Sequence, residues 1–270
     1  ALTPLPAETV AVSEAAGRVL SEDIAARRTQ PPVAVSAMDG WAVRAADVAT
    51  VPAALRQIGE APAGGAYDGS VGPRQAVRIF TGGPMPKGAD TVVIQEDVDA
   101  DGARLTVREG APAGTYVRPA GLDFSAGEIC LKAGRRLTPA DVGLAAAMDV
   151  PWLPVRRKPR IALLATGNEL VRPGEPVGPN QIVSSNATAL AALIRHAGGE
   201  AIDLGIARDE RQSLVTMAEG ARGTDMLITL GGASVGDHDL VQKVLGERGL
   251  KLDFWQIAMR PGKPLMFGSV

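Results

Sequence analysis

A glycine-rich turn near the end of the chain could bind a phosphate group. It follows the apolar run Met226–Leu230 and contains Gly231, Gly232, Ser234 and Gly236. Glycines let the backbone approach a ligand closely, and their N–H groups form an anion cradle with the N-terminus of the helix that follows. An ordinary strand-to-helix turn explains the same residues equally well, so both interpretations stay open.

The same turn contains the pattern Gly-x-Ser-x-Gly around Ser234, which marks the nucleophile of many hydrolases. In those enzymes the acid and then the histidine follow the serine along the chain. Here the one histidine after Ser234 is His238, which lies too near in the chain to reach back over the turn. A serine hydrolase is therefore kept as an alternative, and a hydrogen bond from Ser234 to a phosphate is preferred.

Two carboxylates follow apolar runs that are typical of buried strands. Glu169 comes after Ile161–Ala165, and Asp239 comes after Met226–Leu230. Ligands of open α/β sheets bind beyond the carboxyl ends of the strands. Two carboxylates beside a phosphate repel it unless a divalent cation joins them, and Mg²⁺ prefers such oxygen ligands. Glu169 and Asp239 are therefore candidate metal ligands, and helix capping is their alternative role.

Two cations flank a Pro-Gly turn after the strand-like run that ends at Met259. Arg260 and Lys263 lie close together in the chain there, and paired cations bind oxyanions well. A solvated basic turn is the alternative interpretation.

Four further candidates lie in Gly- and Pro-rich loops of the first half of the chain. Asp39 and Thr81 lie in tight turns that are typical of functional loops, although Asp39 with Gly40 also fits a hairpin turn. Arg118 and Asp123 lie on either side of a glycine. They form either a local ion pair or part of a site.

The composition excludes several classes of protein. The 270 residues carry a formal net charge of -2 and only 3% aromatic residues, which argues against a nucleic-acid partner. Cys130 is the only cysteine, so disulfide frameworks and multi-cysteine metal sites are excluded. Neither a membrane-spanning run nor a signal-peptide pattern is present, so we expect a cytoplasmic protein without a membrane partner.

The last part of the chain alternates strands with helices, which predicts a parallel sheet covered on both faces. Ser184 or Ser185 is expected to cap the first of these helices, and Asp209 the second. The predicted strands are 161–165, 201–206, 226–230, 254–259 and 265–267, and the predicted helices are 185–197, 209–221 and 239–248.

In the segment before residue 155, the sequence predicts short β-type runs at 76–80, 91–95 and 104–107. Helices are predicted on either side of them, at 13–20 and 139–148. The expected fold class is multidomain α/β plus β, with a three-layer parallel-sheet α/β domain. We expect a discontinuous linking domain at 1–32 and 121–157, a small β-rich domain at 33–120 and the α/β domain at 158–270.

Six segments together resemble the molybdopterin molybdenumtransferase family, which includes MoeA and the gephyrin E domain. They occur in the order and spacing of that family over nearly the whole chain, so their combination is specific. The matching segments are Ser36–Val43, Phe80–Asp97, Arg118–Gly127, Ala165–Leu170, Gly231–Asp239 and Met259–Pro264.

The resemblance implies the last catalysed step in the assembly of the molybdenum cofactor. Adenylylated molybdopterin and molybdate are the substrates, the adenylate bond is hydrolysed with Mg²⁺, and molybdenum is inserted with release of AMP. It also implies a homodimer whose composite cleft combines the α/β domain of one subunit with the β domain of the other. An upstream adenylyltransferase and downstream molybdoenzymes are the implied protein partners.

The resemblance carries over to individual positions of this chain. Asp39 and Thr81 would be catalytic residues of the cleft, and Glu169 and Asp239 would bind the cation and help to hydrolyse the adenylate. The implied substrate-binding residues are Arg118, Asp123, Gly231, Gly232, Ser234, Gly236, Arg260 and Lys263.

The chain departs from the pattern of the family in four residues and at its end. It ends before the Gly-Leu-Pro-Gly-Asn-Pro loop and the C-terminal β domain of the family, so we expect a truncated α/β domain. A gephyrin-like scaffold without turnover is therefore an alternative. An adenylyltransferase acting one step earlier is another alternative, because the two steps share the type of α/β domain, but the long N-terminal β region favours the later step. The departing residues are Val35 in place of the usual Asn, Trp41 in place of Tyr, Asn168 in place of Asp and Arg260 in place of Lys.

Overall fold

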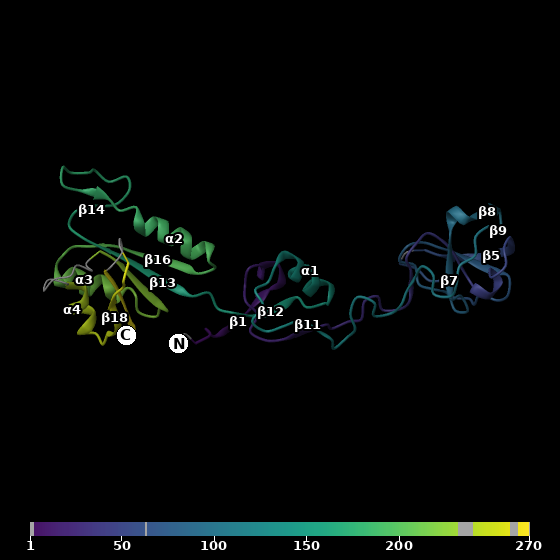
Figure 1. The fold of residues 1–270 in the computed structure, drawn as a ribbon, viewed down its shortest axis with the longest axis horizontal. Coiled ribbons are helices and arrows are strands. Elements are labelled where there is room, and N and C mark those ends of the chain that lie inside the picture. The colour runs from purple at the N-terminus through teal and green to yellow at the C-terminus, as the bar shows by residue number, and fades with distance from the viewer. Residues whose placement is uncertain (1–2, 63, 232–239, 260–263, 270) are drawn as a thin grey trace. The chain divides into compact units, whose positions relative to one another are not determined.

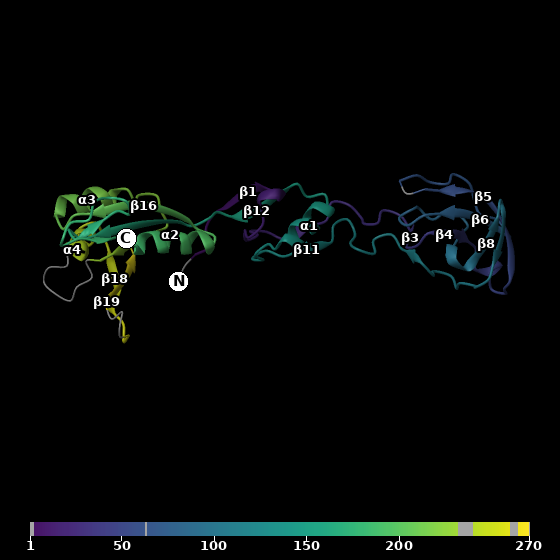
Figure 2. The same ribbon diagram turned by 90° about the horizontal axis from the view of Figure 1, so that it is seen from above.

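The computed structural model describes residues 3–62, 64–231, 240–259 and 264–269. The chain forms two compact units, one made of Ala1–Glu8 with Arg156–Val270 and the other of Thr9–Val155. The boundaries fall within strands β1 (Ala7–Ala11) and β12 (Trp152–Arg156). Each unit is described by itself, and Figures 1 and 2 show its elements in two views.

The first unit contains a parallel three-stranded sheet in the order β16-β13-β17. The central strand, β13 (Arg160–Thr166), is apolar because both of its faces are covered. Leu163 packs with α2, whereas the next residue, Leu164, packs with α3 and α4 on the opposite face. Alternation along one strand thus builds three layers, with α2 and α3 on opposite sides of the sheet (Figure 2). The other elements are β16 (Glu200–Ala207), β17 (Met226–Leu230), α2 (Asn186–His196), α3 (Arg211–Glu219) and α4 (Leu240–Gly246).

Two smaller pairs of strands complete the described part of this unit. Strands β14 (Leu170–Val171) and β15 (Ile182–Val183) pair in parallel. Strands β18 (Lys251–Gln256) and β19 (Pro264–Ser269) pair antiparallel, which places β18 a few residues earlier than the predicted 254–259.

The second unit contains a six-stranded sheet in the order β7-β4-β6-β5-β9-β8. Both faces of this sheet are covered, because Trp41 and Val43 of β4 belong to one apolar cluster and Ala42 to another. The strands are β4 (Gly40–Val43), β5 (Ala53–Ala61), β6 (Gln75–Ile79), β7 (Thr91–Ile94), β8 (Val98–Asp101) and β9 (Arg104–Val107). Two 3₁₀ turns, Ala45–Asp47 and Gln95–Asp97, adjoin it.

A further core in the same unit combines two distant parts of the chain. Leu20 and Ile24 pack there with residues such as Leu131, Met148 and Leu153. Helix α1 (Pro139–Ala147) begins at a capping box, in which Thr138 and Asp141 each bond the backbone N–H of the other. The strands beside this core are β2 (Ile24–Ala25) with β11 (Ile129–Leu131), and β12, which pairs with β1. Strands β3 (Val35–Ser36) and β10 (Val117–Arg118) also pair, and Val117 packs with an apolar cluster of the six-stranded sheet.

The predicted helix at 13–20 is wrong. The structure has only a 3₁₀ turn at Val12–Glu14, after which Gly17 takes a φ of 77°. Val19 and Leu20 then form isolated β-bridges with Arg136 and Val155. The spacing of the apolar residues at 13–20 fits a helix. Pairing with distant segments nevertheless decides the backbone conformation of this segment.

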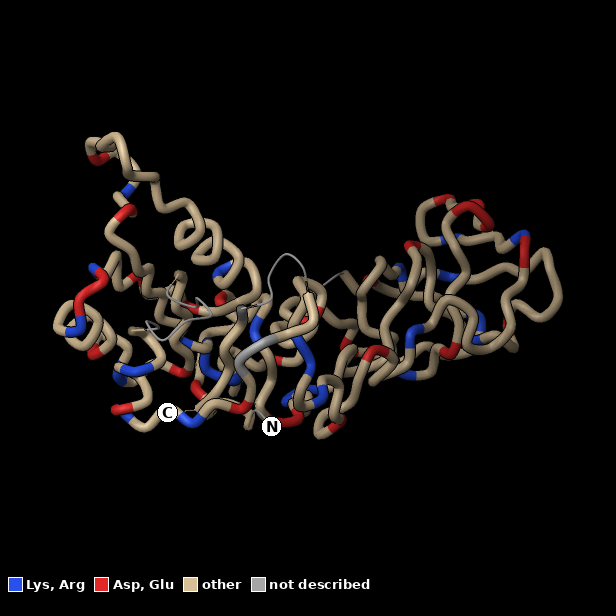
Figure 3. The backbone as a smooth tube through the Cα atoms, turned by 60° about the vertical axis from the view of Figure 1, so that its left-hand side comes forward, with Lys and Arg blue, Asp and Glu red and all other residues tan. Residues whose placement is uncertain are grey.

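The expected fold class, multidomain α/β plus β, is confirmed by the sheets and by the solved relatives described below. The division into three domains stays a prediction. Acidic and basic residues are interspersed along the backbone of both units (Figure 3). In the described parts of the chain, the helices are too short or too polar to cross a membrane.

Candidate functional site

Asp39 and Thr81 are brought together by two neighbouring antiparallel strands. Asp39 directly precedes β4, Thr81 follows the end of β6, and Gly40 pairs with Ile79 between them. The N–H and the Oγ1 of Thr81 both donate hydrogen bonds to Asp39 Oδ1, at 2.7 and 2.8 Å. These bonds, with a smaller contribution from the charge of Arg78, hold the pKa of Asp39 below its ordinary value. The residue is therefore a carboxylate at neutral pH.

Gly40 lies in the middle of the sheet, so the alternative of a hairpin turn at Asp39 and Gly40 is wrong. It pairs with Ile79 on one side and with Ile94 on the other. A Cβ atom at this position would overlap the backbone oxygen of Val93. Only glycine allows the strands to approach so closely directly after Asp39.

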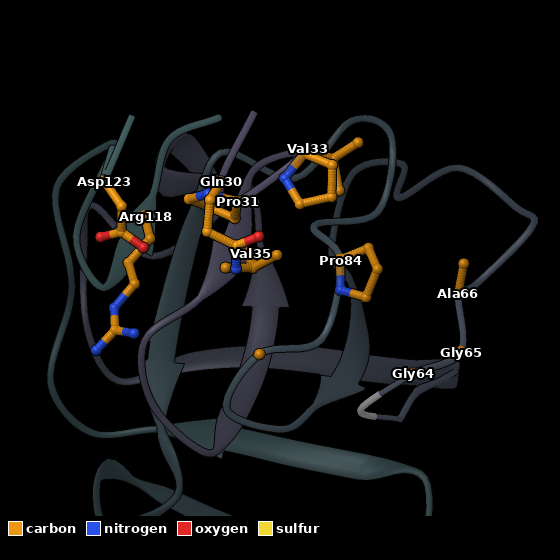
Figure 4. Close-up of a pocket in the computed structure, with 12 residues that line it drawn as sticks. Gln30, Pro31, Val33, Val35, Gly64, Gly65, Ala66, Pro84, Arg118 and Asp123 are labelled. Carbon is orange, nitrogen blue, oxygen red and sulfur yellow. The ribbon is translucent and has the colours of Figure 1, made fainter. Parts of the chain in front are cut away.

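A cavity of about 520 Å³ lies beside this pair in the same unit, and Figure 4 shows its lining. Arg118 and Asp123 line it together with Val35, which pairs with Arg118 across β3 and β10. Gly82, next to Thr81 in the chain, also lines the cavity. The other lining residues are Gln30, Pro31, Pro32, Val33, Gly64, Gly65, Ala66 and Pro84.

Arg118 and Asp123 lie near each other in Figure 4 without forming a salt bridge. The backbone N–H of Asp123 donates to the carbonyl of Gln30 at 3.0 Å, which ties its loop to another segment of the cavity lining. Both side chains are exposed, so the cavity offers one positive and one negative group beside an apolar surface. This arrangement suits a ligand that has both an apolar part and polar substituents. Val35 gives this wall an apolar side chain.

In the other unit, three strands end at the same edge of the parallel sheet. The N–H of Gly167, directly after β13, donates to Ala207 O at the end of β16, at 3.1 Å. Gly231, directly after β17, has a φ of 92°, and a Cβ atom there would lie 2.6 Å from Thr166 O. The close approach explains why glycines follow both strands, and it places the start of the glycine-rich turn at the carboxyl edge, where ligands of such sheets bind.

Glu169 lies at this edge with an exposed carboxylate. A Cβ atom at Gly167, whose φ is 145°, would lie 2.7 Å from Glu169 Oε1. Among the described residues, the Glu169 carboxylate has no hydrogen-bond or salt-bridge partner. Its donor chemistry therefore fits a hard cation such as Mg²⁺. The described residues contain no group of three or more acidic, histidine or cysteine side chains that could hold a metal alone.

Asp209 lies at the same edge and is a further candidate that reasoning from the sequence missed. It was predicted to cap α3, but the N-cap is Glu210, and no side chain caps this helix end. Instead, Asp209 Oδ2 accepts from the N–H of Asn168 at 3.3 Å, and Asn168 Oδ1 accepts from the N–H of Asp209 at the same distance. Arg208 also donates to Asn168 O, at 3.2 Å. The signal was available, since Asp209 follows the end of a strand in the same way as Glu169.

For the other predicted helix cap of this unit, the position is confirmed but the capping bond is not formed. Ser185 is the N-cap of α2, but its backbone is helical and its side chain makes no capping hydrogen bond.

Six predicted site residues cannot be placed, because they lie outside the described residues. These are Gly232, Ser234, Gly236, Asp239, Arg260 and Lys263.

Two family models match the chain. The MoeA N-terminal region (domain I and II) matches residues 1–148, and the model described as "Probable molybdopterin binding domain" matches residues 162–270. Apart from Arg160 and Ile161, the parallel sheet of the first unit lies within the second match, and the pair of Asp39 and Thr81 lies within the first.

Curated relatives align over nearly the whole chain. The molybdopterin molybdenumtransferase of Nostoc sp. is 40% identical over 96% of this chain and 60% of its own length. Molybdopterin molybdenumtransferase 2 of Mycobacterium tuberculosis is 36% identical over 97% of this chain and 67% of its own. The chain thus spans about two thirds or less of the length of these relatives.

Solved structures support the same relationship. A crystal structure of the molybdopterin biosynthesis moeA protein from Pyrococcus horikoshii matches with a TM-score of 0.85 at 34% identity, covering 100% of this chain and 69% of that one. A second solved structure, described as a molybdopterin biosynthesis moeA protein from Pyrococcus horikoshii OT3, has the same TM-score at 30% identity and covers 98% of this chain. The combined evidence of sequence, fold and residue placement shows that the chain belongs to the molybdopterin molybdenumtransferase (MoeA) family.

Proposed function

We propose that the protein inserts molybdenum into adenylylated molybdopterin, with Mg²⁺-dependent hydrolysis of the adenylate bond and release of AMP. Family membership supports a role in molybdenum cofactor biosynthesis. The observation that carries the finer proposal is the exposed carboxylate of Glu169 beside Gly167 and Gly231, at the carboxyl edge of the sheet. An acidic oxygen donor next to a glycine-rich turn suits a phosphate–metal complex.

Each group of residues has its own part in this proposal. Glu169 and Asp239 would hold Mg²⁺, which neutralises phosphate charge and stabilises the charge that develops on its oxygens. The turn with Gly231, Gly232, Ser234 and Gly236 would bind the phosphate of the pterin through backbone N–H groups. Arg260 and Lys263 would bind molybdate or a phosphate.

The second unit would supply the remaining contacts. Asp39 would accept a hydrogen bond from the substrate through Oδ2, because Thr81 occupies Oδ1 with two donors. Arg118 would pair with an anionic group of the substrate, and Asp123 would accept from N–H or O–H groups. Their common cavity would hold the flat part of the ligand against Pro31 and Val35.

We also propose that the protein acts as a homodimer in which two subunits complete each cleft. An adenylyltransferase that supplies the adenylylated substrate and molybdoenzymes that accept the product are the proposed partners. The resemblance to the family implies such a composite cleft. The candidate residues of one chain are divided between its two units, which is compatible with it.

The test is an AMP-release assay with adenylylated molybdopterin, Mg²⁺ and molybdate. We expect AMP release that depends on both ions. Release without any dependence on molybdate would contradict molybdenum insertion. Tight binding of adenylylated molybdopterin without any release would instead favour the scaffold alternative.

A further inference from the structure

Arg78 lies between two aromatic rings beside the pair of Asp39 and Thr81. Its guanidinium carbon is 4.5 Å from the centre of the Trp41 ring and 4.9 Å from the centre of the Phe80 ring. Stacked arginines of this kind are attracted by the faces of both rings. The Trp41 ring is itself fixed, since its Nε1 donates to Gln57 Oε1 at 2.9 Å. The guanidinium therefore has a defined plane and position.

The edge of the same guanidinium bonds two segments that flank Asp39. Arg78 Nη1 donates to the carbonyl of Gly40 at 3.2 Å, and Nη2 donates to Gln95 Oε1 at 2.8 Å. The backbone N–H of Gln95 donates to the carbonyl of Asp39 at 3.1 Å. Arg78 thus restrains the backbone of Asp39 in two ways. It bonds the carbonyl of Gly40, the next residue in the chain, and it bonds the side chain of Gln95, whose N–H bonds the carbonyl of Asp39.

Phe80 extends this arrangement to the other member of the pair. It directly precedes Thr81, whose N–H and Oγ1 both bond Asp39 Oδ1. Stacking of Arg78 on Phe80 therefore limits the movement of the backbone that carries Thr81. One side chain contacts the segments on both sides of the hydrogen-bonded pair.

We propose that Arg78 is a positioning residue that holds Asp39 and Thr81 in register for substrate. This inference rests on the proposed function of that pair. Its chemistry requires arginine, because a planar guanidinium can stack on two rings while its edge donates to two acceptors in different directions. A lysine ammonium has the charge but not the plane. The charge of Arg78 also contributes to the lowered pKa of Asp39, after the two bonds from Thr81.

The test compares Arg78→Met, Arg78→Lys and the control Arg104→Met. Arg104 is an exposed arginine on β9 of the same sheet, and no side-chain bond to the described residues is seen for it. Three quantities are measured for each variant: the urea midpoint of unfolding, the pKa of the Asp39 carboxyl by ¹³C NMR, and kcat and KM for AMP release. The assignment of the Asp39 signal is made with Asp39→Asn.

We expect Arg78→Met to raise the pKa of Asp39 and to lower kcat by about tenfold or more, with a smaller change in KM. In Arg78→Lys the pKa of Asp39 should be closer to its wild-type value than kcat is, because lysine restores the charge but does not stack on the rings. Arg104→Met should change none of these values. A folded Arg78→Met variant with unchanged kcat and unchanged Asp39 pKa would overturn the proposal, and a loss of urea stability alone would show a purely structural role.

Two further cases need their own measurements: a variant that does not fold, and a wild-type protein that releases no AMP. If Arg78→Met does not fold, Gln95→Leu removes the acceptor of Nη2, together with a long bond from Gln95 Nε2 to Glu96 Oε1 at 3.4 Å. This variant should lower kcat in the same direction, and an unchanged kcat would count against the proposal. If the wild-type protein releases no AMP, the proposed function fails. The NMR comparison then still decides whether Arg78 positions Asp39, because that measurement needs no substrate.

Discussion

Asp39 Oδ1 accepts two hydrogen bonds from one residue, the N–H and the Oγ1 of Thr81. The carboxylate is therefore fixed at one oxygen and open at the other. The strands that carry the two residues are neighbours in the sheet, so the relationship depends on sheet register rather than on sequence distance.

Substitution of Thr81 should distinguish the contributions of its backbone and side-chain bonds to Asp39. Thr81→Ala removes the Oγ1 bond and keeps the backbone bond, so the pKa of Asp39 should rise while remaining below its ordinary value. AMP release should fall by about tenfold if Asp39 has the proposed catalytic role, since one constraint on its carboxylate is lost. Thr81→Ser keeps a hydroxyl and is the matched control. NMR titration and initial rates measure the two effects, and an unchanged Asp39 pKa in Thr81→Ala would contradict the assigned bond.

Glu169→Gln tests the proposed cation site. The substitution removes the charge but keeps the shape of an exposed side chain, so the fold should be unaffected. Mg²⁺-dependent AMP release should fall by about a hundredfold or more, because a metal supplies several kcal/mol of charge stabilisation. Glu210→Gln, which changes another exposed glutamate of the same unit, is the control. Full activity of Glu169→Gln across a Mg²⁺ titration would exclude Glu169 as an essential ligand.

The composite cleft can be tested by subunit complementation. Asp39→Ala and Glu169→Gln proteins should each be inactive alone. Mixed dimers should have one intact cleft, so random mixing should restore about a quarter of the wild-type activity. The mixture is assayed after refolding together. Failure to recover activity in mixed dimers, with the dimers shown to form by two affinity tags, would argue that each cleft uses one chain only.

Two glycines should respond in opposite ways to alanine. Gly40→Ala forces a Cβ atom against the backbone of Val93, so it should lower the free energy of unfolding by about 2 to 3 kcal/mol. Gly143 lies exposed in α1 with open space around it, and Gly143→Ala should raise stability by about 0.5 to 1 kcal/mol. Urea unfolding curves measure both. Equal effects of the two substitutions would contradict the placement of Gly40 between β6 and β7.

Acid should weaken the start of α1. Asp141 bonds Arg135 and Thr138, and these bonds lower its pKa from 3.8 to about 2. The lowered pKa means that this stabilisation is complete above about pH 4 and is lost as the pH falls through about 2. Asp141→Asn should therefore cost about 1 to 2 kcal/mol at neutral pH, and the difference from wild type should shrink below pH 4. A constant difference from pH 7 to pH 2 in urea unfolding would show that the charge of Asp141 is not responsible.

Local patterns determined much of the α/β unit. Strand β13 is a continuous apolar run because both faces are buried, and the helical spacing of Leu190 and Ile194 predicted α2. Thr138 with Pro139 predicted the start of α1, because capping depends on residues that are neighbours in the chain. Such features need no information from distant segments.

Tertiary structure decided the features that depend on pairing between distant segments. The residues at 13–20 have a helix-like spacing, yet Val19 and Leu20 form bridges with Arg136 and Val155. Asp39 with Gly40 fits a hairpin turn locally, whereas the sheet places Gly40 in a central strand. Arg78 gave no sequence signal, since its partners come from three different strands or turns.

The sequence by itself determined which residues could do chemistry: the acidic, basic and glycine-rich turns and their order along the chain. Tertiary structure alone decided which of them meet, as Asp39 meets Thr81 and Asn168 meets Asp209. The physical reason is that residue type and local spacing fix propensity and charge. Sheet register, by contrast, depends on the packing of the whole unit, which no single segment encodes.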